Sequence, residues 1–172
     1  MNFPSTAHKE AALAGTLLYP LIGDGVFKFV NMYGMPEIIL PEPKSLWAAG
    51  ADLRAWGNHV VPAHGTVAVG TGLSVEMPTR FLAIEFTPRS GLALNEQITV
   101  GNAPGLIDPD YRGELMVILK NSANTDFHIV SGDRIAQMQI RLNLMQLCTF
   151  MFVKELSNTE RGENGLGSSG VK

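Results

Sequence analysis

The chain has 172 residues, of which 45% are hydrophobic and 17% are charged, and its formal net charge at pH 7 is −3. This length and balance suit one domain with a core of its own and exclude an intrinsically disordered protein. The single cysteine excludes an internal disulfide, and the negative net charge gives no bulk positive field for nucleic acid or anionic lipid. We therefore expect no nucleic-acid partner, no membrane partner and a cytoplasmic location.

The first 24 residues are expected to form an N-terminal extension of the domain. Their apolar stretch, residues 11–22, is interrupted by Pro20 and is too short to span a bilayer. Lys9 before it is balanced by Glu10, so the stretch lacks the basic start of a secretory signal. Residues 7–18 suit a short helix.

Residues 25–156 have the period-two pattern of β-strands. Odd positions from 67 to 77 are mostly apolar while even ones are small or polar, and residues 138–144 alternate in the same way. Further strands are expected at residues 26–30, 81–86, 115–119 and 147–153, the last with Cys148 in the core. Because turn-forming residues separate these short strands, we predict an all-β sandwich or barrel with one short helix at 90–97.

Five polar segments carry the candidate chemistry of the chain. They are AGADL at 49–53, PRSGL at 88–92, GLIDPDYRG at 105–113, GDRIAQ at 132–137 and RGENGLGSSG at 161–170. Each has a plain structural explanation: a strand entry, a helix cap, a type I turn beginning at Asp108, a hairpin turn with Arg134 paired to an acid, and a mobile tail. The second also suits an anion, because backbone N–H groups at a helix start favour phosphate.

Taken in order, the five segments resemble the five motifs of the trimeric dUTP diphosphatase (dUTPase) family. The resemblance covers residues 49–170 and implies a jelly-roll-like β-barrel subunit that forms a homotrimer with active sites between subunits. It implies hydrolysis of dUTP to dUMP and diphosphate with Mg²⁺. The Gly/Ser-rich residues 157–172 would then be a flexible tail that closes over a neighbouring active site.

The resemblance also implies a role for individual residues. Asp108 would activate the attacking water, and Asp52 would contact Mg²⁺ through water. Phosphate contacts would come from Arg89, Ser90, Gly91, Gln137, Arg161, Gly167, Ser168 and Ser169. The deoxyuridine would be bound by Asn102, Gly105, Ile107, Tyr111, Met116 and Leu166, with Tyr111 packed under the deoxyribose. Leu166 stands where the family usually has a phenylalanine that stacks on uracil, so we expect Leu166→Phe to lower the KM for dUTP.

Two other interpretations stay open at this point. A dCTP deaminase has the same fold but would need a glutamate as its central acid, where this chain has Asp108. A nucleotide-binding regulatory trimer could keep the pocket and use residues 1–24 to bind partners. Asp108 and the Gly/Ser-rich tail favour a diphosphatase over the deaminase, and the presence of Asp52, Asp108 and Arg161 argues against an inactive protein.

Overall fold

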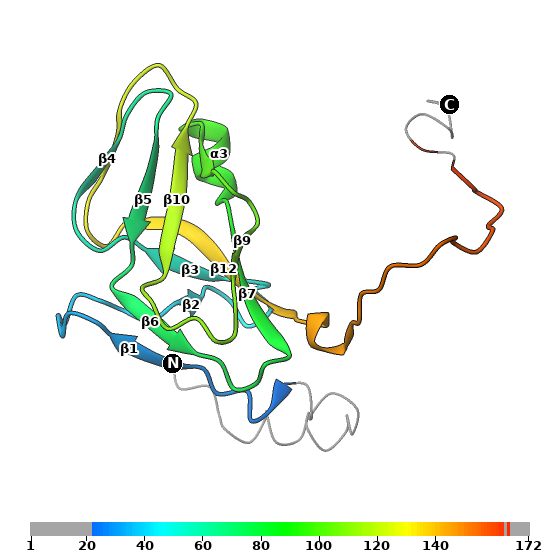
Figure 1. Ribbon diagram of the computed structural model, residues 1–172. Helices are drawn as coiled ribbons and strands as arrows, with labels where there is room; N and C mark the ends of the chain where they lie inside the picture. The colour runs from blue at the N-terminus through cyan, green and yellow to red at the C-terminus, as the bar shows by residue number, and fades with distance from the viewer. Residues whose placement is uncertain (1–21, 164, 166–172) are drawn as a thin grey trace.

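The computed structural model describes residues 22–163 and residue 165, and it consists mainly of β-strands (Figure 1). The strands are β1 (Lys28–Asn31), β2 (Glu42–Pro43), β3 (Ala51–Arg54), β4 (His59–Val61), β5 (Thr66–Gly70), β6 (Leu73–Glu76), β7 (Leu82–Thr87), β8 (Ile98–Val100), β9 (Gly105–Ile107), β10 (Met116–Asn121), β11 (Phe127–Ile129) and β12 (Arg134–Leu142). The helical elements described in full are α3 (Ser90–Asn95) and the 3₁₀ turn η1 (Met145–Leu147). The all-β class predicted from the sequence is confirmed.

The strands pair in antiparallel fashion around one hydrophobic core. The largest sheet has the order β2-β3-β12-β7-β9, and a second has the order β5-β10-β8. Two further pairs are β1 with β6 and β4 with β11. Alternation along β10 buries Val117 and Leu119 while Ile118 and Lys120 face outward, as a strand with one solvated face requires. The buried side chains of the sheets, such as Leu53, Ile84 and Val117, therefore form one continuous core.

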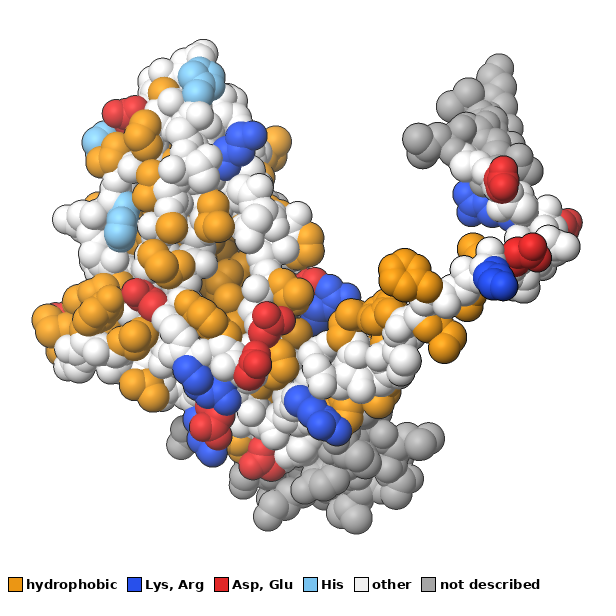
Figure 2. Space-filling view, viewed as in Figure 1, with side chains coloured by type: hydrophobic (Ala, Val, Ile, Leu, Met, Phe, Trp, Pro, Cys, Tyr) orange, Lys and Arg blue, Asp and Glu red, His pale blue; other side chains and the backbone are white. Residues whose placement is uncertain are grey.

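The chain after β12 differs from the strand predicted over residues 147–153. η1 ends at Leu147, and residues 148–163 extend away from the β-domain without strand pairing (Figure 1). Cys148 is exposed, which contradicts its predicted place in the core. Figure 2 shows hydrophobic side chains along this segment, and Phe150 and Phe152 are 78% and 108% exposed. A strand needs a hydrogen-bonding neighbour, and the described part of the chain places none beside these residues.

The helix predicted at 90–97 is present as the shorter α3. Its N-cap is Arg89, whose side chain makes no capping hydrogen bond, so Ser90 is the first helical residue and not the cap. The helix predicted at 7–18 lies outside the described residues. Within the described residues, no helix has the length and apolar character needed to cross a membrane.

Candidate active site

A buried aspartate and two arginines join β3, β12 and the start of α3. Asp52 lies on β3 and is only 6% exposed. Its Oδ2 accepts a hydrogen bond from Nη1 of Arg134 at 3.1 Å, and its Oδ1 lies 3.4 Å from Nε of Arg89. Arg89 also donates from Nη1 to the backbone oxygen of Arg134 at 3.0 Å. The predicted pairing of Arg134 with an acid is thus confirmed, and the acid is Asp52.

The surroundings of this ion-pair cluster suit a phosphate. Gln137 lies directly opposite Asp52 in the pairing of β12 with β3, so the two side chains are on the same sheet face. Two guanidinium groups around one carboxylate leave one local positive charge. The exposed Ser90 and Gly91 begin α3 beside it, where the first backbone N–H groups lack partners within the helix. We call Asp52, Arg89, Ser90, Gly91 and Gln137 the Asp52 half-site.

Asp108 begins a turn directly after β9. The N–H of Tyr111 donates to the backbone oxygen of Asp108 at 3.1 Å, which is the hydrogen bond of the predicted β-turn. The Asp108 carboxylate is therefore not needed for the turn, and it is exposed. The phenol of Tyr111 donates to the backbone oxygen of Glu114 at 3.1 Å, and a Cβ on Gly113 would overlap that phenol. Gly113 thus leaves the space that the Tyr111 ring occupies.

The predicted deoxyuridine contacts gather around the same turn and the hairpin before it. Asn102 lies in the loop after β8, and its side chain packs against the buried Gly105. A Cβ added to Gly105 would be 3.4 Å from the Asn102 amide. Ile107 is half-buried and precedes Asp108, and Met116 is 44% exposed at the start of β10. We call this set the Asp108 half-site; it comprises Asn102, Gly105, Ile107, Asp108, Tyr111 and Met116.

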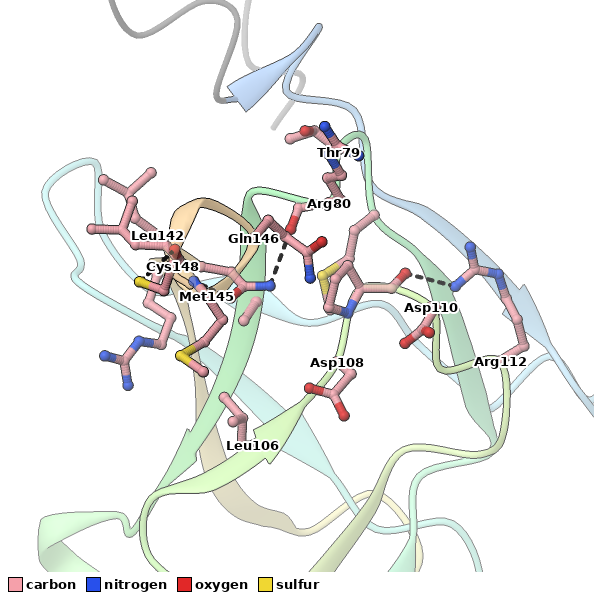
Figure 3. Close-up of a pocket in the computed structure, with 16 residues that line it drawn as sticks. Thr79, Arg80, Leu106, Asp108, Asp110, Arg112, Leu142, Met145, Gln146 and Cys148 are labelled. Atoms are coloured by element: carbon pink, nitrogen blue, oxygen red, sulfur yellow. Dashed lines mark hydrogen bonds between the residues drawn. The ribbon is translucent and has the colours of Figure 1, made fainter. Parts of the chain in front are cut away.

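A groove of about 910 Å³ opens beside Asp108 (Figure 3). Leu106 of β9 and Asp110 of the turn line one part of it, and Met145 of η1 lines another. Arg112 also borders the groove, and its Nη1 donates to the backbone oxygens of Pro109 and Tyr111, each at 2.9 Å. The groove therefore lies between the turn and the start of the extended C-terminal segment.

Asp108 and Arg89 lie near opposite ends of β7. Ile84 pairs with Ile107, which places Asp108 level with Ala83 near the start of β7. Arg89 comes six residues after Ala83, a separation of about 20 Å at roughly 3.3 Å per residue. A catalytic base lies within about 3 Å of the water that it activates, so the base and the ligands of the attacked phosphate have to border the same phosphate group. A single chain does not bring these groups together.

The tail residues are only partly described. Arg161 lies on the extended segment after β12 (Figure 1). Leu166, Gly167, Ser168 and Ser169 lie outside the described residues, so their predicted contacts stay predictions.

Comparison with known proteins identifies the family of this chain. The model of the family described as dUTPase matches residues 36–170. The chain belongs to the dUTPase family. The deoxyuridine 5′-triphosphate nucleotidohydrolase of Helicobacter hepaticus is 46% identical over 133 residues, which are 77% of this chain and 82% of that protein. The family match includes all five polar segments that the sequence analysis singled out.

Solved dUTPases share the fold of this family member. A mutant dUTPase of Staphylococcus bacteriophage 80alpha with dUpNHpp has a TM-score of 0.75 and 24% identity, over 85% of this chain and 99% of that chain. A mutant dUTPase from phage phi11 of S. aureus, which coordinates a structural Mg(II) ion, has a TM-score of 0.61 and 19% identity, over 78% and 97% of the chains. At these identities the likeness establishes the fold.

The donor set of the Asp52 half-site fits an indirect contact to a metal ion. No group of three or more His, Cys, Asp or Glu side chains that could hold a metal occurs in residues 22–163 or at 165. A carboxylate has about four acceptor positions, and the two arginines take two of those on Asp52. The rest can accept hydrogen bonds from water, which suits an ion that Asp52 reaches only through water.

Proposed function

We propose that this dUTPase family member hydrolyses dUTP to dUMP and diphosphate. The observation that carries the proposal is the family match over residues 36–170, which includes both half-sites. The exposed position of Asp108 supports it, because a base that activates water needs access to solvent. A cytoplasmic location and an extension ending at residue 24 stay predictions.

The active site in this proposal is assembled from several subunits of a homotrimer. The separation of about 20 Å between Asp108 and Arg89 supports this, since a second copy has to supply one of them. The exposed apolar residues 150–153 support it as well, because a neighbouring subunit would remove their surface from water. Residues 157–172 of a further subunit would close over the nucleotide.

Asp108 orients the attacking water in the proposed reaction. Its carboxylate accepts a hydrogen bond from the water and takes up a proton as the oxygen bonds to the innermost phosphorus. The bond from that phosphorus to the bridging oxygen breaks in line with the attack, and diphosphate leaves. Phosphoryl transfer needs little covalent work from a protein, so positioning by this carboxylate and by the arginines accounts for most of the catalysis.

The phosphates are held by the Asp52 half-site and the tail. Arg89, Ser90, Gly91 and Gln137 offer charged and neutral donors on one face, and Asp52 keeps Arg89 in place. Arg161, Gly167, Ser168 and Ser169 are the tail residues proposed to bind the outer phosphates. Mg²⁺, which prefers substrate phosphates and retained waters, would be held by the triphosphate and reached by Asp52 through water, and when bound it neutralises phosphate charge.

Selection for deoxyuridine is proposed to rest on the Asp108 half-site. Tyr111 would pack under the deoxyribose, where a 2′-hydroxyl has no space. Asn102, Gly105, Ile107, Met116 and Leu166 would enclose the base and exclude the methyl group of thymine. Cytosine would leave a buried polar group unpaired at a cost of about 1–3 kcal/mol.

Diphosphate release from dUTP, dTTP, dCTP and UTP with Mg²⁺ tests the function. We expect rapid release from dUTP alone, and the mass in solution should be that of a trimer. Equal rates on all four nucleotides would refute the pocket described above. Ammonia release from dCTP would indicate a deaminase, and binding of dUTP without hydrolysis would indicate a regulatory protein.

A further inference from the structure

The carboxylate of Glu114 links the 108–113 turn to another part of the domain. Its Oε1 accepts a hydrogen bond from the backbone N–H of Gly72 at 2.7 Å, and its Oε2 accepts one from the phenol of Tyr33 at 3.1 Å. The backbone oxygen of the same residue accepts from Tyr111. One residue thus contacts Tyr111, the β5–β6 turn and the segment that follows β1.

Tyr33 is itself held in place on the β-domain. Its ring stacks on Trp56 with centroids 6.0 Å apart, and the preceding β1 pairs along its length with β6. A tyrosine phenol is protonated at neutral pH and is therefore a donor to Glu114. The hydrogen bond to Glu114 and the negative charge of that carboxylate raise the pKa of Tyr33 further. Tyr33 precedes residues 36–170, the part that the family model matches.

The Glu114 carboxylate lies close against the backbone of Gly70. A Cβ on Gly70 would overlap its Oε1, so the carboxylate occupies space that a side chain at this position would fill. The next residue, Leu115, is fully buried and donates its N–H to the backbone oxygen of Leu73 at 2.7 Å. The C-terminal end of the 108–113 turn is therefore fastened by both the backbone and the side chain.

We propose that Glu114 and Tyr33 are positioning residues of the Asp108 half-site. They hold the 108–113 turn on the β5–β6 turn, so that the Tyr111 ring stays where it excludes a 2′-hydroxyl. The inference rests on the proposed function for its effect on specificity. It also predicts an effect on the turn that can be measured without substrate.

The test compares Glu114→Ala, Glu114→Gln and Tyr33→Phe by their kcat/KM for dUTP relative to UTP. We expect Glu114→Ala to lower this ratio about 10- to 100-fold, the equivalent of one lost hydrogen bond to a charged group. Glu114→Gln should keep most of the ratio, because its amide oxygen still accepts from Gly72. Tyr33→Phe keeps the ring on Trp56 and removes only the donor, so its effect should be intermediate.

Lys28→Met is the matched control. Nζ of Lys28 binds Glu76 at 2.7 Å across the same β1–β6 pair, and its charged neighbours are Glu76 and Asp24, neither of which belongs to the turn. Amide hydrogen exchange across residues 108–115 should accelerate in Glu114→Ala and Tyr33→Phe and stay unchanged in Lys28→Met. Melting temperatures of all variants separate a general loss of stability from a local one.

Three results would overturn the inference. The first is an unchanged ratio of kcat/KM for dUTP relative to UTP in Glu114→Ala and Tyr33→Phe. The second is an equal loss of this ratio in Glu114→Gln and Glu114→Ala, and the third is amide exchange that accelerates equally in the control. If Glu114→Ala does not fold, the kcat/KM ratio and the amide exchange of Tyr33→Phe decide the question. Absence of dUTP hydrolysis in the unmodified protein would refute the proposed function instead, and the exchange measurement would still decide on the positioning role.

Discussion

Replacing Asp108 by asparagine separates catalysis from binding and folding. The turn hydrogen bond to Tyr111 comes from the Asp108 backbone oxygen, and the exposed side chain is nearly the same size in the variant. We therefore expect stability to stay within about 0.5 kcal/mol of the original, as for other exposed sites. Loss of an acid–base group lowers turnover by about 10²- to 10⁴-fold, which raises the barrier by roughly 3–5 kcal/mol.

The assay is diphosphate release from dUTP, with binding of a non-hydrolysable dUTP analogue measured by calorimetry. Asp108→Asn should bind the analogue with near-normal affinity and turn over at least ~10²-fold more slowly. Asp110→Asn is the control, since Asp110 is exposed on the same turn and lines the same groove. Near-normal turnover in Asp108→Asn, or an equal loss in Asp110→Asn, would remove Asp108 from its proposed role.

Two further substitutions and one truncation test other parts of the site. Asp52→Ala should lower the free energy of unfolding by about 2 kcal/mol, which corresponds to roughly 4–8 °C in melting temperature. The reason is that the variant leaves the guanidinium groups of Arg89 and Arg134 without their carboxylate. An unchanged melting curve would contradict this. Gly113→Ala should push the Tyr111 ring aside, and its dUTP:UTP ratio of kcat/KM should fall, whereas an unaltered ratio would mean that the ring position does not set sugar selection. Truncation after Leu156 should abolish most activity while the trimer mass and melting temperature are kept, and full activity in the truncated chain would show the tail to be dispensable.

Local features could be predicted from the sequence because short-range interactions decide them. The alternation over residues 138–144 predicts a strand, and β12 covers its first part. The Asp-Pro pair at 108–109 favours a turn, and the turn hydrogen bond is present. The helix after Arg89 begins within one residue of its predicted start. The roles of the individual site residues came from the family resemblance, and they stay proposals.

The strand predicted at 147–153 shows where periodicity alone is insufficient. Apolar side chains at 147–153 suit a buried strand, but burial depends on a neighbouring surface that the pattern does not identify. In the single chain that surface is absent from the described residues, and Phe150 and Phe152 remain exposed. The alternation of a segment indicates its preference for burial, but it does not identify the surface against which the segment packs.

The amino-acid sequence by itself determined the strand-rich class, the turn at Asp108 and the family. Only the tertiary structure decided that Asp52 lies between Arg89 and Arg134, that Asp108 lies at the far end of β7, and that Glu114 joins its turn to Tyr33. The physical reason is that the residues in these contacts are far apart in the sequence. Propensity and alternation act over a few residues, whereas these contacts join residues 37 to 82 positions apart and depend on strand order and register.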